Sequence, residues 1–198
     1  MTDCFALLNE PRRPWLDSEQ LKTKFHAVSA ACHPDHFPAS SEAQRRELNQ
    51  RFAEINAAFR CLNDLKDRLQ HLLELEAGAK PKDVQRLPPG TMDLFMEVGQ
   101  KCRDTDAFLA ERARVHSPML KVKLLARGFE WTEQLQNLQG TINQKRNALE
   151  AELRQLNTSW ETAPPPGAAG RGAALPLERI EHLYRSVSYM DRWTEQIQ

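Results

Sequence analysis

The amino-acid sequence has no surplus of either charge, because 27 Lys and Arg residues balance 27 Asp and Glu residues over 198 positions. A nucleic-acid-binding protein normally carries a basic surplus or stripe, so we expect no nucleic-acid partner. The chain also lacks an apolar run as long as a membrane span, and it does not open on a basic-then-apolar leader. We therefore expect a cytoplasmic protein with no membrane partner.

The sequence is equally poor in the motifs of enzymes and metal sites. Its four cysteines, Cys4, Cys32, Cys61 and Cys102, lie far apart, and no Cys-x-x-Cys pair suggests a zinc site. It has neither a glycine-rich phosphate loop nor a nucleophile elbow, and its six histidines are scattered. We expect four reduced and mostly buried thiols, no metal, no cofactor and no enzymatic activity.

What the sequence does contain is helical periodicity on both sides of the tripeptide His33-Pro34-Asp35. The apolar positions are Leu21, Phe25 and Val28 before it, and Leu48, Phe52, Ile55, Phe59 and Leu62 after it. These spacings are typical of amphipathic helices. Pro34 disfavours helical backbone at the preceding residue, so the first helix should end near Cys32. We predict an antiparallel hairpin with the tripeptide at its exposed tip.

Capping residues and helix breakers place the remaining elements of the amino-terminal half. We expect a short helix over 4–8, a helix from 18 to 32 capped by Asp17 or Ser18, and a helix over 42–62 capped by Ser40 or Ser41. A fourth helix over 65–76 should end at Gly78. The segment 79–90 contains three prolines, which is typical of a linker.

The carboxy-terminal half also has only helical patterns, so we predict an all-α protein. Thr91 should cap one helix, Ser117-Pro118 should begin another, and a long helix should cover 130–160. The proline- and glycine-rich stretch 164–172 should not hold a helix. The last helix begins near 177, and its core-facing residues should be Ile180, Leu183, Val187, Met190 and Ile197, with Tyr189 and Trp193 away from that stripe.

Several short stretches follow the order of a known family: Trp15-Leu16-Asp17, His33-Pro34-Asp35-His36-Phe37, Glu54-Ile55-Asn56-Ala57-Ala58-Phe59 and Leu62-Asn63-Asp64. Together with the helical hairpin they resemble the J domain of chaperone co-factors. Their details are most similar to the HscB-like co-chaperones of iron–sulfur cluster assembly. The resemblance implies a J domain over 1–78, a linker over 79–90 and an antiparallel three-helix bundle over 91–198.

The resemblance also implies partners and site residues. His33, Pro34 and Asp35, with Lys22 and Lys24 on the preceding helix, would bind a DnaK/HscA-type chaperone and stimulate its ATPase. In the bundle, Phe95, Met96 and Tyr189 would bind an IscU-like iron–sulfur scaffold protein and deliver it to the chaperone.

The sequence departs from the family in the binding segment of the bundle. Gly99, Lys101 and Arg103 occupy positions where the family has acidic residues and leucine. An alternative therefore stays open, in which the chain is a J-domain protein that delivers a different client. The bundle would then be a general protein-binding or oligomerisation module.

Overall fold

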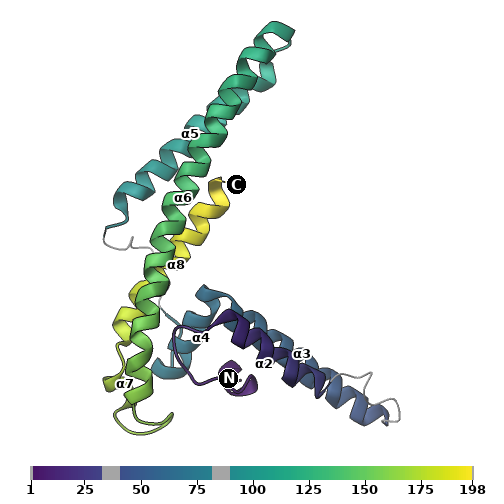
Figure 1. Cartoon of the computed structure of the whole chain (residues 1–198), viewed down its shortest axis with the longest axis vertical. Helices are drawn as coiled ribbons and strands as arrows, with labels where there is room; N and C mark the ends of the chain where they lie inside the picture. Colours follow the sequence, from purple (N-terminus) through teal and green to yellow (C-terminus); the bar gives the residue numbers. More distant parts are fainter. Residues whose placement is uncertain (1, 33–40, 82–89, 198) are drawn as a thin grey trace. The chain divides into compact units, whose positions relative to one another are not determined.

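The computed structural model describes residues 2–32, 41–81 and 90–197, and within these ranges every regular element is a helix (Figure 1). This confirms the all-α prediction. The tripeptide His33-Pro34-Asp35 and most of the predicted linker lie outside the described residues. Each described helix is too short or too polar to span a lipid bilayer.

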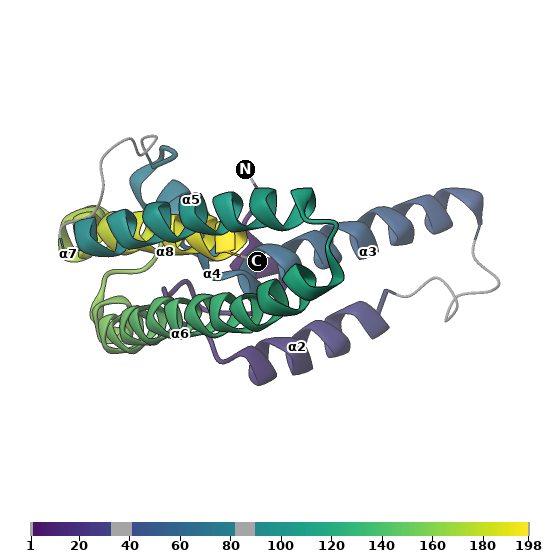
Figure 2. The same cartoon turned by 90° about the horizontal axis from the view of Figure 1, so that it is seen from above.

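The helices α2 (Ser18–Ala30) and α3 (Glu42–Asn63) form the predicted hairpin and lie side by side in Figure 2. The rings of Phe25 and Phe59 stack between them, with centroids 4.3 Å apart. Leu21 on α2 and Ile55 on α3 are buried in the same hairpin. The two apolar stripes therefore meet face to face, as their spacing predicts.

Local capping explains where both helices begin. The side chain of Asp17 accepts hydrogen bonds from the backbone N–H groups of Glu19 and Gln20. Ser41 and Gln44 form a reciprocal capping box at the start of α3, with each side chain bonded to the backbone of the other residue. The caps at Asp17 and Ser41 are those that the sequence predicts.

Two further helices close the base of the hairpin. In α1 (Cys4–Leu7), Phe5 is fully buried, and in α4 (Leu65–Ala77) Leu69 and Leu72 are fully buried. The helix α4 ends at Gly78, which adopts a left-handed backbone with φ +73° and donates its N–H to the carbonyl of Glu74. Both helices match the prediction to within one residue.

The chain divides into two compact units, which we call the first and the second unit. The first unit comprises Met1–Asp83 and Glu150–Tyr184, and the second comprises Val84–Leu149 and Arg185–Gln198. The helices α6 (Pro118–Thr162) and α8 (Leu177–Ile197) contribute residues to both units. The predicted domain boundaries follow the order of the chain and stay a prediction.

Polar contacts attach the segment 150–184 to the rest of the first unit. The guanidinium of Arg171 makes a bidentate ion pair with Glu76, with Nη2–Oε1 and Nε–Oε2 distances of 2.7 and 2.8 Å. It also donates to the carbonyl of Pro164. The side chain of Asn157 exchanges two hydrogen bonds with the backbone of Trp15, at 3.0 and 2.9 Å. These contacts join residues that are far apart in the sequence.

The structure corrects two predictions in this region. The helix that begins at Pro118 continues without a break to Thr162, because no proline follows until Pro164. A short helix, α7 (Arg171–Ala174), begins inside the stretch 164–172 that was predicted to be a loop. The ion pair of Arg171 with Glu76 holds this turn in place.

The second unit has an apolar core built by α5 (Met92–Arg114), α6 and α8, and α6 runs antiparallel to the other two helices in Figure 1. Its buried residues are Leu94, Val98, Leu138, Ile142, Met190, Trp193 and Ile197. The core positions predicted on α8 are all buried. The prediction for Trp193 was wrong, since it is only 3% exposed: it lies three residues after Met190 and four before Ile197, on the same face. Thr91 precedes α5 but makes no side-chain cap.

We expect the pair Arg171–Glu76 to stabilise the first unit far more than a similar pair at the surface. Its side chains are 8% and 3% exposed, whereas those of Arg179 and Glu152, also paired by two hydrogen bonds, are 50% and 31% exposed. Replacing Arg171 by Met should cost about 3 kcal/mol, because it leaves a buried carboxylate without its main partner. The matched variant Arg179→Met should cost about 1 kcal/mol or less. Urea denaturation measures both, and equal losses would contradict the prediction.

Candidate partner-binding sites

The two lysines predicted to contact a chaperone have different surroundings on α2. Lys22 is exposed to solvent. The ammonium of Lys24 lies 2.9 Å from a carboxylate oxygen of Glu10 and donates to the carbonyl of Asn9 at 3.0 Å. The Glu10 side chain is only 2% exposed, so Lys24 neutralises a buried carboxylate. Asn9 has φ +52°, a left-handed backbone that asparagine tolerates, and this turn presents its carbonyl to Lys24.

The described residues on either side of 33–40 are well anchored. Cys32, at the end of the α2 segment, is buried, and its thiol donates to the carbonyls of Val28 and Ser29 at 3.5 and 3.4 Å. On the other side, the capping box of Ser41 and Gln44 fixes the first turn of α3. The predicted site residues His33, Pro34 and Asp35 follow Cys32 in the sequence and lie outside the described residues.

The first turns of α5 have one apolar side in the core and another in solvent. Leu94 and Val98 are buried, at 4% and 1% exposure. Met92, Phe95 and Met96 remain 55%, 41% and 58% exposed. Their spacing of three and four residues places these three side chains on one face of the helix. We call them the α5 patch.

Tyr189 lies on α8 and packs against the same core that holds Leu94 and Val98. It is half-buried, and its ring lies 5.8 Å from the ring of Trp193 and 5.7 Å from the guanidinium of Arg192. The structure thus places the helix segments that carry Phe95, Met96 and Tyr189 around one core. Their role in binding stays a prediction.

The side chains of Lys101 and Arg103, which depart from the family pattern, contact residues that the sequence does not predict. Lys101 donates to Gln134 at 2.6 Å and its ammonium lies 5.5 Å from the centre of the Trp131 ring, so its charge is directed at α6. Arg103 donates to Gln100 on its own helix at 2.7 Å. A Cβ atom added at Gly99 would meet only the Arg103 guanidinium, at 3.4 Å.

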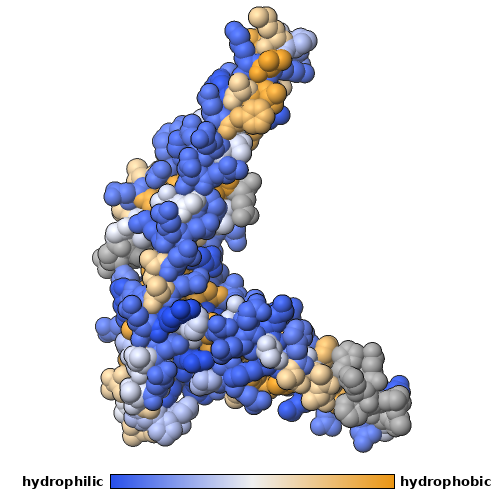
Figure 3. All heavy atoms as spheres, viewed as in Figure 1, coloured by the Kyte–Doolittle hydropathy of each residue, from blue (hydrophilic) through white to orange (hydrophobic). Residues whose placement is uncertain are grey.

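A second exposed apolar surface covers the turn between α5 and α6, and the sequence analysis missed it. Figure 3 shows apolar side chains over this turn. Its residues, which we call the tip patch, are Leu109, Met119, Leu120, Val122, Leu125 and Phe129, each 49–73% exposed. The signal in the sequence is the crowding of apolar residues over 119–125, of which only Leu124 is buried. A single helix face cannot bury so many neighbours.

Comparison with known proteins shows similarity to HscB co-chaperones in both sequence and fold. No family model matches it. The HscB co-chaperone homologue of Bordetella pertussis is 33% identical over 61% of this chain and 74% of its own length. Among solved structures, HscB of Vibrio cholerae has a TM-score of 0.61 at 17% identity and covers 99% of this chain and 95% of its own. Human HscB has a TM-score of 0.64 at 16% identity, over 100% and 81% of the two chains.

These similarities agree with the helical hairpin and the helical bundle described above. The fold is that of a J-domain co-chaperone. The identity to the Bordetella relative, over three quarters of that protein, makes the assignment specific. The chain belongs to the HscB co-chaperone family.

The different surroundings of Lys22 and Lys24 predict different effects of the same substitution. Among the ion pairs of the described residues, replacing Lys24 by Met leaves the buried Glu10 carboxylate with Arg13, whose guanidinium is 3.7 Å away. The expected loss of stability is about 1–3 kcal/mol, the penalty for an unsatisfied buried group. The variant Lys22→Met should stay within about 0.5 kcal/mol of the parent, since its side chain is exposed. Urea midpoints test this, and equal midpoints for the two variants would refute it.

Proposed function

We propose that this co-chaperone stimulates the ATPase of a DnaK/HscA-type chaperone through His33, Pro34 and Asp35, and delivers an iron–sulfur scaffold protein that its second unit binds. The observation that carries the proposal is the α2–α3 hairpin, with the tripeptide between its helices, in a member of the HscB family. The name of the family relatives, co-chaperone, supports the chaperone partner.

The tripeptide suits a role in recognition rather than in bond chemistry. Asp35 offers a carboxylate that forms charge-assisted and even two-pronged hydrogen bonds with an arginine of the partner. His33 adds a donor or acceptor beside it. Pro34 restricts the backbone between them, which lowers the entropy lost on binding. Contacts of this kind act by favouring the hydrolysis-competent state of the chaperone.

Electrostatic attraction contributes little to this encounter. Lys22 presents its charge to solvent, whereas the charge of Lys24 is partly neutralised by its ion pair with Glu10. Ala30, Ala31 and Cys32 add no charge before the tripeptide. The association rate should therefore depend weakly on salt, because few exposed charges steer the partner.

For the scaffold protein, the α5 patch together with Tyr189 is the proposed docking surface. Methionine and aromatic side chains are enriched at the centres of protein interfaces, and exposed apolar clusters mark such sites. The burial of Leu94 and Val98 fixes the helix that carries the patch. Binding therefore costs little further conformational entropy. Lys101 supports the assignment, because its charge is directed at α6.

Delivery of a different client is the second candidate, and the tip patch is the observation that favours it. Six exposed apolar residues gather there, outside the segments that resemble the family's scaffold site. A client that binds the tip patch would make the second unit a general protein-binding module.

Replacing His33 by Gln should abolish the stimulation of the chaperone's ATPase. We expect at least a tenfold loss, or about 1.4 kcal/mol of coupling, because the variant lacks the imidazole of the tripeptide. Single-turnover ATP hydrolysis by the DnaK/HscA-type chaperone measures the effect, with circular dichroism to confirm intact helices. The control is His116→Gln, an exposed residue between α5 and α6. Unchanged stimulation by His33→Gln would rule out the role of the tripeptide.

Scaffold binding should depend on the α5 patch and Tyr189, and not on the tip patch. We expect Phe95→Ala and Tyr189→Ala each to weaken binding of an IscU-like scaffold about 30-fold, or about 2 kcal/mol, as central interface residues do. The matched controls Phe129→Ala and Val122→Ala remove exposed apolar groups from the tip patch and should leave the affinity unchanged. Isothermal titration calorimetry on the full chain measures all four.

The opposite pattern would select the alternative. If the scaffold shows no affinity while an unrelated client loses affinity on Phe129→Ala, the second unit carries a different client. If the scaffold itself binds but only the tip-patch variants weaken it, the assignment of Phe95, Met96 and Tyr189 is wrong.

A further inference from the structure

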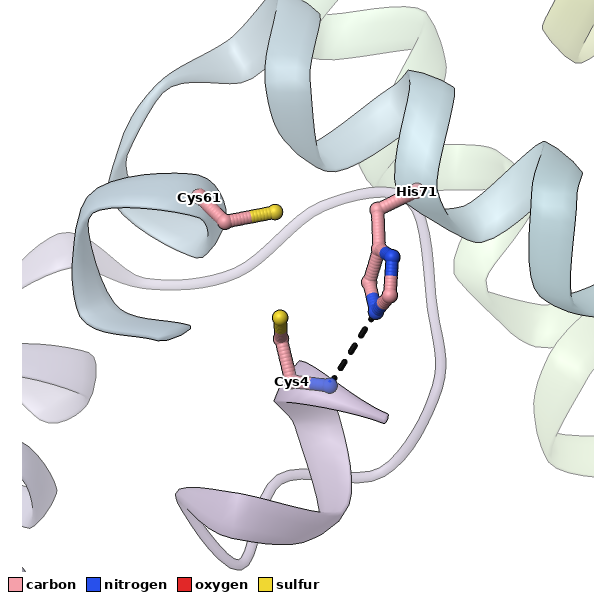
Figure 4. Close-up of side chains that lie close together, drawn as sticks. All are labelled: Cys4, Cys61 and His71. Atoms are coloured by element: carbon pink, nitrogen blue, oxygen red, sulfur yellow. Dashed lines mark hydrogen bonds between the residues drawn. The ribbon is translucent and has the colours of Figure 1, made fainter. Parts of the chain in front are cut away.

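Three side chains with metal-binding atoms meet in the first unit, although they come from three helices. Cys4 opens α1, Cys61 lies near the end of α3, and His71 lies in the middle of α4. One potential ligand atom from each lies within 4.8 Å of the other two. Figure 4 shows both sulfur atoms and the imidazole ring facing a common space. Among the described residues, this is the one such group of three His, Cys, Asp or Glu side chains.

The imidazole of His71 is held with its Nε2 lone pair toward the backbone of Cys4. The residue is 8% exposed, and its ring stacks on Phe5 with centroids 6.0 Å apart. Its Nε2 accepts a hydrogen bond from the backbone N–H of Cys4 at 3.1 Å, so this nitrogen carries no proton (Figure 4). A neutral imidazole with an unprotonated nitrogen is the form that binds metal ions.

The surroundings of the three ligands favour a cation. The carboxylates of Asp3, Asp67 and Glu74 lie close enough to act on the charge of the cluster. Asp3 acts on Cys4 and His71, Asp67 acts on Cys61, and Glu74 acts on both Cys61 and His71. Cysteine ligates metals as the thiolate, so binding of an ion here would release the thiol protons of Cys4 and Cys61.

We propose that Cys4, Cys61 and His71 bind one Zn²⁺ ion through two sulfur atoms and Nε2, with water as the fourth ligand. Two sulfurs and one imidazole form a borderline-soft set that favours zinc over Mg²⁺ or Ca²⁺. Tetrahedral zinc–sulfur and zinc–nitrogen bonds of about 2.3 and 2.0 Å keep ligand atoms about 3.5–3.8 Å apart. Ligand atoms that lie within 4.8 Å of one another reach this spacing by approaching no more than about 1 Å. The ion takes over the electron pair that now accepts the Cys4 N–H.

A disulfide between Cys4 and Cys61 is the competing use of this cluster, and the position of His71 argues against it. A disulfide needs only the two sulfurs and gives the imidazole no part. A metal ion uses all three side chains and ties α1 to both α3 and α4, at the base of the helical hairpin. Because the ion binds only the folded arrangement, it should stabilise the first unit.

The test uses the full chain, stripped of metal with a chelator and kept reduced with a phosphine. Titration with Co²⁺ should give thiolate-to-cobalt charge-transfer absorption and the visible bands of a four-coordinate ion, saturating at one equivalent. Zn²⁺ should displace the cobalt and raise the Tm of the protein. Cys4→Ser and Cys61→Ser should each weaken Zn²⁺ binding at least about 100-fold and remove the charge-transfer absorption in proportion to the lost sulfur.

Matched variants outside the cluster provide the control. Cys102→Ser and His116→Gln lie in the second unit and should leave stoichiometry and affinity unchanged. Binding at full strength in Cys4→Ser or Cys61→Ser would overturn the proposal, as would the absence of one-equivalent binding in the parent. So would rapid Cys4–Cys61 disulfide formation with dilute hydrogen peroxide in a parent that takes up no zinc. Cys4→Ser and Cys61→Ser are small changes at half-buried sites, so we expect both variants to fold. Circular dichroism of each variant checks this.

Discussion

The apolar contact between α2 and α3 is the interaction on which the placement of the amino-terminal features depends. Phe25 stacks on Phe59, and Leu21 and Ile55 are buried in the same hairpin. This contact holds α2 and α3 against each other, while the buried Cys32 follows α2 and the capping box of Ser41 begins α3. A hairpin packed in this way is a rigid base, and a rigid base lowers the entropy that a motif held by it loses on binding.

The first unit also relies on buried charges at the points where loops meet helices. Lys24 neutralises Glu10, and Arg171 neutralises Glu76. Arg68 is buried and donates to the carbonyls of Pro14 and Leu62 at 3.0 and 2.7 Å, and its burial lowers its pKa to about 10. Each of these groups would be costly without its partner, so the loops are held in one arrangement. Both units have apolar cores, and in the second unit the helix α5 also exposes apolar side chains on its other side.

The sequence predicted what local chemistry determines. The caps at Asp17 and Ser41 and the glycine end of α4 depend on neighbouring residues, so they can be predicted from the sequence alone. Contacts between residues far apart in the sequence could not be predicted in this way. The meeting of Cys4 with His71, 67 positions apart, follows from the packing of α1 on α3 and α4, which no spacing rule describes. The error at Trp193 has a different cause, because its spacing from Met190 and Ile197 already places it on the core face, and grouping it with Tyr189 overlooked that spacing.

The same reasoning explains why the departures from the family pattern do not by themselves decide the partner. From the sequence, Lys101 reverses the charge expected beside Phe95 and Met96. In the structure its ammonium lies against Trp131 and Gln134, so the α5 patch keeps an apolar character without an adjacent lysine charge. A charge matters for recognition only where it is presented, and side-chain direction is a property of tertiary packing. The helix segments that carry the two patches each have buried residues, which are Leu94 and Val98 for the α5 patch and Phe108 and Leu124 for the tip patch. Burial of the supporting segment is therefore common to both surfaces and does not decide which of them takes the partner.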